Sequence, residues 1–197
     1  MSVASEPLGR RERNKQEKLQ RIIAAAGDLF STHGVDEVTT QQIADQADIG
    51  TGTLFLYAKT KGELLLLVQN ANYGAALEQG RSAAAAEADP LAAVLAIVRP
   101  VVACNRSQVD NGRTYLREMA FGDPAEPHHA AALAIAAETE GAIAQALARH
   151  PRVAAADAAT LAHVVSAIMF LSMAGSVDPE VDTILDDVRR QVSAILP

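Results

Sequence analysis

The chain has 197 residues, 49% of them hydrophobic, and a formal net charge of −7, which allows one or two folded domains and excludes a disordered chain. Aromatic residues make up only 4% and alanine is abundant, so helices are favoured over strands. Cys104 is the only cysteine, which excludes a disulfide within one chain and a cysteine-based zinc site. The N-terminus has no apolar core of a signal peptide, and no continuous apolar run of about 18 residues predicts a membrane span. We therefore expect a cytoplasmic protein without a membrane partner.

The charge is unevenly distributed along the chain. Residues 1–62 contain eight basic and eight acidic residues, which leaves nine basic and sixteen acidic residues for the remainder. The basic residues near the N-terminus form a run, namely Arg10, Arg11, Arg13, Lys15, Lys18 and Arg21. This run is either the solvated start of a helix or an arm that lies along DNA phosphates. The acidic remainder would repel DNA and so orient the molecule on it.

The N-terminal part of the chain predicts short helices. Residues 1–9 are expected to form a disordered tail, and apolar residues at helical spacing predict a helix over 11–32. Gly34 follows it, where a left-handed C-cap glycine is favoured. Thr39 and Gln42 have the spacing of a capping box, so a short helix is expected there.

The next elements continue this pattern. Residues 48–50 interrupt the first short helix, and a second one is expected over 51–57. Thr60 and Glu63 form a second predicted capping box, which begins an apolar helix over 61–79.

The remainder predicts further helices and no convincing strand. Residues 80–89 are the best linker candidate, although their alanines could continue the preceding helix. Pro100 predicts a kink or a break in its helix. Asp110-Asn111-Gly112 predicts a turn, and Asp178-Pro179 is expected to cap the last helix. The helices are expected at 90–106, 111–121, 128–149, 154–174 and 179–196, which gives an all-α fold of about nine helices.

Two short helices around a tight turn suit a helix-turn-helix reader of the DNA major groove. The residues that carry this pattern are Gly34-x4-Thr39-Thr40-x2-Ile43-Ala44-x2-Ala47-x-Ile49-x2-Gly52-Thr53-Leu54-Phe55-x-Tyr57-x3-Lys61. Over roughly residues 14–75 the chain resembles the DNA-binding domain of the tetracycline-repressor (TetR) family. It departs from the family at Asp48 and Gly50, which replace a frequent Gly and Ser of the turn, at Ala58 and at Gly62.

The resemblance implies an all-α homodimer that regulates transcription. A three-helix head would span 10–62, with a connecting helix to about 80, and a ligand-binding and dimerisation domain would span 81–197. The last two helices would pack against their copies in the partner. A small molecule in the larger domain would release the head from a double-stranded DNA operator, so the protein would act as a repressor.

The resemblance also implies the residues of the DNA interface. Thr40 would meet a phosphate, and Gln41 would meet either a phosphate or a base edge. The base-facing residues would be Thr51, Thr53 and Leu56, and the remaining phosphate contacts would be Tyr57, Lys59 and Lys61. Packing in the core is the expected role of Ile43, Ala44, Leu54 and Phe55. With no Arg or Lys in the second short helix, base discrimination should be weak, so we predict a dimer on a pseudo-palindromic operator.

Several residues of the larger domain are candidates either for a ligand pocket or for ordinary packing. They are Cys104, Tyr115, Met119, Phe121, His163, Met169 and Phe170. Few charges lie among them, so an uncharged or weakly polar, largely apolar ligand is expected. His128-His129 is expected to be an exposed pair and not a metal site, and Cys104 has no activating partner in the sequence.

Other classes of function remain as alternatives. For an enzyme, the chain has no glycine-rich phosphate loop, metal-ligand motif or nucleophile elbow, and no cofactor is predicted. A helical adaptor that binds only protein would fit the composition equally well. DNA binding with strong salt dependence would separate a regulator from both.

Overall fold

The computed structural model describes residues 9–196, and within them it has nine α-helices and no strand. The predicted all-α class is therefore confirmed. The predicted tail over 1–9 lies, apart from Gly9, outside the described residues. The helices are α1 (Arg10–His33), α2 (Thr40–Gln46), α3 (Thr51–Leu54), α4 (Lys61–Ala84), α5 (Pro90–Arg106), α6 (Val109–Phe121), α7 (Pro127–Ala148), α8 (Ala155–Gly175) and α9 (Val181–Ile195).

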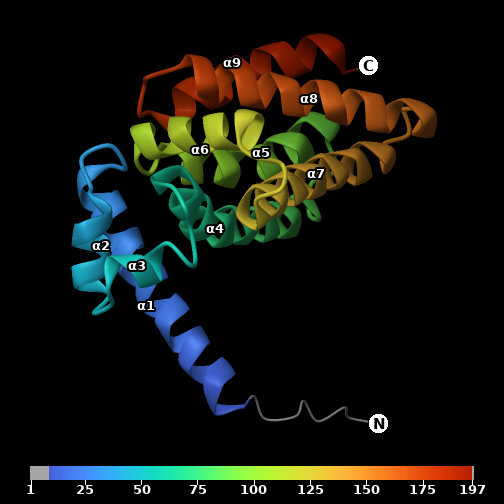
Figure 1. Ribbon diagram of the computed structural model, residues 1–197. Coiled ribbons are helices and arrows are strands. Elements are labelled where there is room, and N and C mark those ends of the chain that lie inside the picture. Colours follow the sequence, from blue (N-terminus) through green and yellow to red (C-terminus); the bar gives the residue numbers. More distant parts are fainter. Residues whose placement is uncertain (1–8, 197) are drawn as a thin grey trace.

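The first three helices form a small unit at one end of the molecule (Figure 1). The N-terminal half of α1 projects away from the body, α2 packs against α1, and α3 packs against α2. Helix α4 joins this unit to the rest, because it contacts α1 and also α5, α6 and α7. Helices α8 and α9 lie together on the side opposite α4.

The two predicted capping boxes differ in the structure. At α2 the box is complete, because Thr39 Oγ1 accepts from the Gln42 amide at 3.2 Å and Gln42 Oε1 accepts from the Thr39 amide at 2.8 Å. At α4 the Thr60 hydroxyl accepts from the Glu63 amide at 3.0 Å, as predicted. The Glu63 carboxylate instead accepts from the amide of Lys59 at 2.6 Å, one residue earlier than a capping box requires.

Some predicted breaks are absent because burial on a neighbouring helix outweighs the local signal. Helix α4 continues to Ala84, so only 85–89 remain as the connection and the alternative of a continued helix is confirmed. Helix α5 runs without a break through Pro100, since Ile97, Val98 and Val101 around it are buried. The hydrophobic contacts of this face offset the hydrogen bond that proline cannot donate.

Three further local predictions need correction. Gly34 has a positive φ of 79°, but its ψ of 155° is extended and not left-handed helical. Asp110-Asn111-Gly112 forms the first turn of α6, because the Gln108 side chain caps that helix by accepting from the Asn111 amide at 2.6 Å. Asp178 precedes the last helix without capping it, and α9 begins at Val181.

Helix α8 is the described helix that is long and apolar enough to cross a membrane by length and composition. The bent pair of α5 and α6 passes the same test together, with an angle of 110° between them. The sequence predicts no membrane span, because it has no continuous apolar run of about 18 residues. Core helices of globular proteins share these properties, so they are weak grounds for a membrane segment.

Candidate nucleic-acid interface and a linked cavity

The turn between α2 and α3 is built around Asp48, which has a positive φ of 53°. Aspartate is one of the few side chains that adopt this conformation with little penalty. Arg21 of α1 supports the turn, because its Nη1 lies 3.2 Å from Asp48 Oδ2 and 3.4 Å from the Asp48 carbonyl oxygen. This contact explains how aspartate replaces the glycine that the family pattern favours at this position.

Gln41 joins α2 to α3. Its Oε1 accepts from the hydroxyl of Thr51 at 2.8 Å, and its Nε2 donates to Asp45 Oδ1 at 2.7 Å. Gln41 and Thr51 are both predicted DNA contacts, but here each is held by the other. The pair links the two short helices across the turn.

A groove runs between the projecting half of α1 and the segment formed by α3 and the turn after it. Arg11, Lys15 and Lys18 line one side, and Thr53, Leu56 and Tyr57 line the other. Leu56 is 83% exposed, and the Tyr57 hydroxyl donates to the Lys15 carbonyl oxygen at 3.3 Å. The groove therefore combines three predicted DNA contacts with basic side chains of α1. These basic residues are not among the DNA contacts that the family resemblance implies.

The other predicted contacts of this unit are placed differently. Thr40 is the first residue of α2 and is half-buried, and the Lys59 side chain is exposed. Lys61 Nζ donates to the carbonyl oxygens of Val35 and Asp36 at 2.9 and 3.0 Å, so its ammonium is held against the loop that follows α1. These bonds use two of the three protons of the ammonium group, and the third can still donate to a phosphate, so the Lys61 contact stays a prediction.

The predicted packing roles are confirmed for three of four residues. Ile43, Ala44 and Leu54 are buried, but Phe55 is 45% exposed and its predicted core role is wrong. Helix α3 has only one regular turn before the chain turns at residues 55–57, which leaves Phe55 on the outside.

Asn111 of α6 holds the end of α1. Its Oδ1 accepts from the Val35 amide at 2.7 Å, and its Nδ2 donates to the Phe30 carbonyl oxygen at 2.8 Å. The side chain is 1% exposed, so both bonds are shielded from water. Helix α6 is thereby fixed to the loop that leads into α2.

A second set of hydrogen bonds reaches the turn after α3. The Tyr115 hydroxyl donates to Asn70 Oδ1 at 2.9 Å, and Asn70 Nδ2 donates to the His128 carbonyl oxygen at 2.9 Å. His128 Nε2 lies 3.1 Å from the Tyr57 carbonyl oxygen, which can only accept, so we assign the proton to Nε2. His128 is half-buried and bonded, and not the exposed residue that the sequence predicts.

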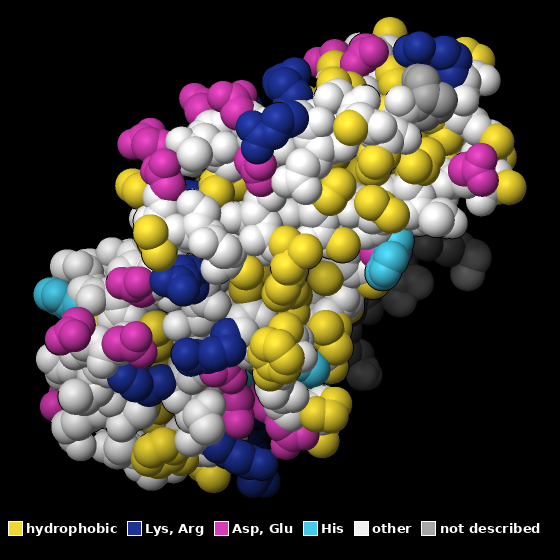
Figure 2. All heavy atoms as spheres, turned by 90° about the horizontal axis from the view of Figure 1, so that it is seen from above, with side chains coloured by type: hydrophobic (Ala, Val, Ile, Leu, Met, Phe, Trp, Pro, Cys, Tyr) yellow, Lys and Arg dark blue, Asp and Glu magenta, His cyan; other side chains and the backbone are white. Residues whose placement is uncertain are grey.

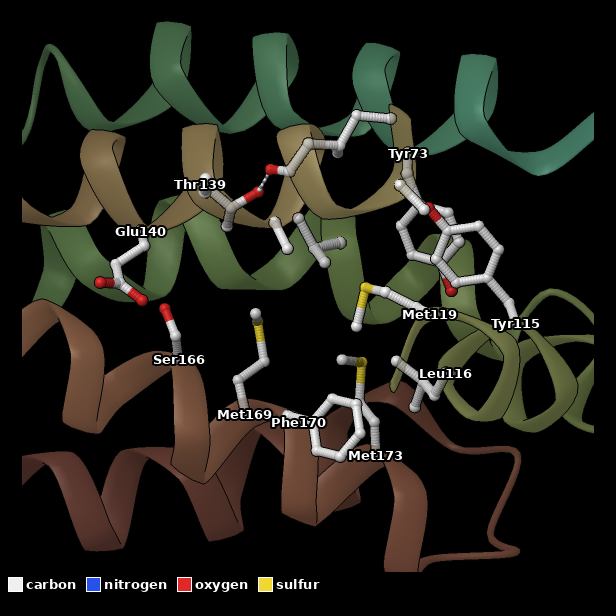
Figure 3. A pocket seen from close by; sticks show the side chains of 15 residues that line it. Tyr73, Tyr115, Leu116, Met119, Thr139, Glu140, Ser166, Met169, Phe170 and Met173 are labelled. Atoms are coloured by element: carbon white, nitrogen blue, oxygen red, sulfur yellow. Dashed lines mark hydrogen bonds between the residues drawn. The ribbon is translucent and has the colours of Figure 1, made fainter. Parts of the chain in front are cut away.

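An apolar cavity of about 340 Å³ lies between α4, α5, α6, α7 and α8. Four of the predicted pocket residues line it, namely Tyr115, Met119, Met169 and Phe170 (Figure 3). Tyr73 stacks on Tyr115 with ring centroids 4.2 Å apart. Burial raises the pKa of both phenols well above the usual range, so they remain protonated at neutral pH.

The other three pocket candidates lie elsewhere. Phe121 is 85% exposed at the end of α6, and His163 is exposed on α8 with Nδ1 3.1 Å from Glu140 Oε2. Cys104 lines a separate shallow groove between α4 and α5. Helical spacing identified apolar positions but could not tell which side of each helix faces this cavity.

The thiol of Cys104 should be unreactive in the folded protein. Burial raises the pKa of this thiol to about 11, so very little thiolate forms at pH 8. We expect Ellman's reagent at pH 8 to label the folded protein at least about tenfold more slowly than the urea-unfolded protein. Equal rates in the two states would contradict this assignment.

The same thiol makes stability depend on pH. Because its pKa is higher in the folded than in the unfolded protein, its contribution to the free energy of unfolding should fall as the pH rises from about 9 to 11.

An apolar face extends over α8 and α9. Leu171 is 67% exposed, and Val164 of α8 and Ile195 of α9 are also exposed. Figure 2 views the molecule from the side on which α8 and α9 lie in Figure 1, and hydrophobic side chains gather in a band across it. Contiguous exposed apolar surface of this kind is typical of interaction sites.

The described part of the chain brings together no group of three or more His, Cys, Asp or Glu side chains that could hold a metal ion. His129 is 5% exposed, so the predicted exposure of the His128-His129 pair is wrong for this residue too, and its Nε2 lies 3.0 Å from the Met119 carbonyl oxygen.

Comparison with known proteins gives a family match for part of the chain. Residues 22–68 match the profile described as "Bacterial regulatory proteins, tetR family". No curated protein matches the chain. The matched residues include Asp48, Gln41 and the side of the groove formed by Thr53, Leu56 and Tyr57, while the basic side chains of α1 in that groove precede the match.

Solved structures extend the similarity to the whole fold. Thermus thermophilus FadR, a TetR-family repressor in complex with lauroyl-CoA, is 23% identical with a TM-score of 0.67, over 89% of this chain and 93% of that one. A TetR/AcrR-family regulator from Thermobifida fusca is 17% identical, with a TM-score of 0.65 over 89% and 96%. A TetR-family regulator from Streptomyces coelicolor is 23% identical, with a TM-score of 0.64 over 92% and 97%. Residues 22–68 therefore match the DNA-binding part of TetR-family regulators, and over about nine-tenths of its length the chain has the fold of TetR-family transcriptional regulators.

Proposed function

We propose that this regulator is a repressor that binds a pseudo-palindromic operator as a dimer and is released by a small molecule. Residues 10–62 form the DNA-binding unit, α4 connects it to about residue 80, and 81–197 bind the ligand and the partner. The groove shared by the basic side chains of α1 and the exposed side of α3 carries this proposal. A protein that acts on chromosomal DNA works in the cytoplasm of a bacterium.

The two sides of that groove have complementary roles on DNA. Thr53 and Leu56 offer methyl groups and a hydroxyl to base edges, which suits thymine methyl contacts but supplies no bidentate pair. Arg11, Lys15 and Lys18 provide the phosphate contacts that set affinity and register. Lys59 adds a phosphate contact from the other side of the turn.

Dimerisation supplies the specificity that one such unit lacks. The exposed apolar face with Val164, Leu171 and Ile195 is the surface that we assign to the partner copy. Two units then read half-sites about one helical turn of DNA, ~34 Å, or a multiple of it apart. This assignment also gives a role to the long apolar α8, whose exposed side is covered in a dimer.

Release of the DNA by the ligand depends on α6, because one face of this helix lines the cavity and the other contacts the DNA-binding unit. Tyr115, Leu116 and Met119 line the cavity, while Asn111 on the same helix holds the loop before α2. A ligand that shifts α6 must strain or break these bonds. The hydrogen bonds from Tyr115 through Asn70 and His128 to Tyr57 give the cavity a second link to the turn after α3. The ligand acts by favouring the arrangement of helices that does not fit the operator.

The cavity walls favour a largely apolar effector. Methionine, alanine and aromatic side chains form most of the lining. FadR, which shares this fold, is in complex with lauroyl-CoA, so an alkyl chain is a reasonable occupant of a cavity in this arrangement of helices.

The experiment that tests the proposal is selection of DNA by the purified protein from a random pool, followed by sequencing. We expect an enriched inverted repeat, and an affinity for it that falls with salt by a logarithmic slope of about −0.9 for each phosphate contact. Replacing Arg11, Lys15 and Lys18 with glutamine should flatten that slope. Replacing the exposed Arg99, Arg117 and Arg152 in the larger part serves as a control that removes the same charge and should leave the slope unchanged. No enriched motif would refute the proposal and favour a helical protein that binds only other proteins.

A further inference from the structure

The apolar cavity has few polar atoms that remain free. The hydroxyl of Tyr115 donates to Asn70, and the hydroxyl of Tyr73 accepts from Asn105 Nδ2 at 2.8 Å, so both tyrosines turn their rings to the cavity and use their oxygens elsewhere. Thr139 Oγ1 donates to the Ile135 carbonyl oxygen at 2.8 Å. Two polar side chains in the lining are left for a ligand, Glu140 of α7 and Ser166 of α8.

Ser166 is unsatisfied in the fold. Its Oγ is buried and has no hydrogen-bond partner. A buried hydroxyl without a partner is destabilising, and the group can both donate and accept. A ligand atom in the cavity would remove this cost, so Ser166 marks a position where the ligand is polar.

Glu140 gives the same region a negative charge. It is the one charged side chain in the described lining, and no Lys or Arg accompanies it. Its Oε2 lies 3.1 Å from Nδ1 of the exposed His163, which can donate to one oxygen and leaves the carboxylate able to accept a second donor.

These two groups lie at one end of the cavity. Figure 3 shows Glu140, Ser166 and Thr139 together on one side, and the tyrosine pair with Met119 on the other. Ser166, Met169 and Met173 follow one face of α8 for two helical turns, about 10 Å. The cavity is thus elongated and apolar along most of its length, and a carboxylate and a hydroxyl without a partner lie at one end.

From this arrangement we propose that the effector is an apolar molecule with a protonated amine at one end. The ammonium group donates to Glu140 and Ser166, and the hydrocarbon part fills the space toward Tyr73 and Tyr115. A carboxylate or phosphate head would face the Glu140 charge with no Lys or Arg in the lining to offset it, and His163 is already directed at that carboxylate. The inference rests on the proposed function in one respect, that the cavity is the effector site.

Three probes with the same hydrocarbon and different heads test this: n-octylamine, n-octanol and n-octanoate, each titrated into the full-length protein in a calorimeter below its micelle-forming concentration. We expect n-octylamine to bind at least about tenfold more tightly than n-octanoate, with n-octanol between them. Glu140→Gln should weaken amine binding about tenfold and leave n-octanol binding unchanged. Ser166→Ala should weaken binding of the amine and of the alcohol by a few-fold.

Two control variants separate the role of Glu140 from general effects. Glu138→Gln removes a carboxylate from the same helix outside the cavity and should leave binding of all three probes unchanged. His163→Ala removes the partner but keeps the carboxylate, so amine binding should persist. Loss of amine binding in His163→Ala to the extent seen in Glu140→Gln would show that the pair is only a structural contact, and it would overturn the proposal.

The remaining outcomes distinguish the ligand class from the site itself. Ala136→Phe fills the cavity and should abolish binding of every probe, with folding checked by thermal unfolding. If n-octanoate binds as tightly as n-octylamine and Ala136→Phe abolishes both, the cavity is a ligand site but the amine assignment is wrong. If no probe binds, both the amine assignment and the role of the cavity fail, while DNA binding is judged separately by the selection experiment.

Discussion

Replacement of Leu56 with glutamate should reduce operator affinity at least about 100-fold while the fold stays intact. Leu56 is 83% exposed in the groove between α1 and α3, so the substitution removes little packing. In the proposed complex the new carboxylate faces the phosphates and base edges of the DNA major groove. Each protomer of the dimer contributes one such carboxylate. Like charges in contact cost several kcal/mol, which corresponds to this loss of affinity. Fluorescence anisotropy with labelled operator at fixed salt measures it.

Leu133 provides the matched control for this prediction. It is an exposed leucine on α7, far along the chain from the DNA-binding unit, and Leu133→Glu makes the same chemical change. Both variants should unfold at the temperature of the unchanged protein, and only Leu56→Glu should lose DNA binding. If Leu56→Glu binds the operator within about threefold of the original affinity, position 56 does not enter the major groove of the DNA.

The second large effect concerns stability, at the contact of α5 with α6. A Cβ atom on Gly112 would overlap the backbone carbonyl oxygen of Asn105 and would lie 2.8 Å from its Nδ2. Because a backbone atom cannot swing away, the two helices must separate, and we expect Gly112→Ala to lower the free energy of unfolding by about 3 kcal/mol. Urea unfolding monitored by circular dichroism measures the change.

Gly74 on α4 is the control, since a Cβ there would meet nothing within 4 Å. Gly74→Ala should raise the free energy of unfolding by up to about 1 kcal/mol, because alanine favours the helix. Gly112→Ala should also weaken operator binding, since it displaces the start of α6 next to Asn111 and so disturbs the loop before α2. A Gly112→Ala protein as stable as the original would show that the crossing of α5 and α6 is adaptable.

The helix-turn-helix unit could be read from the sequence because its signals are local. Thr39 and Gln42 lie three residues apart, and the box they predict is formed. The placement of Phe55 and Lys61 could not be read in this way. Phe55 is exposed because α3 ends early, and Lys61 is held by carbonyl oxygens of Val35 and Asp36, 26 and 25 residues away along the chain.

The larger part of the molecule was less predictable, and the reason is packing. Helical spacing marks apolar positions, and it therefore predicted the helices and named four residues that line the cavity. It could not separate those four from Cys104, Phe121 and His163, because the side of a helix that faces a cavity depends on which neighbours cover it. Burial against α4 also carried α5 through Pro100, where the local signal predicts a break or a kink.

The sequence by itself determined an all-helical chain with a helix-turn-helix unit near its N-terminus, since caps, turns and helical periodicity act between neighbouring residues. Only the tertiary structure decided that the basic residues of α1 share a groove with α3, and that Asn111 ties α6 to the loop before α2. It also placed Glu140 and Ser166 at one end of an apolar cavity. These groups lie far apart along the chain, and they meet because buried apolar surface fixes how the helices cross.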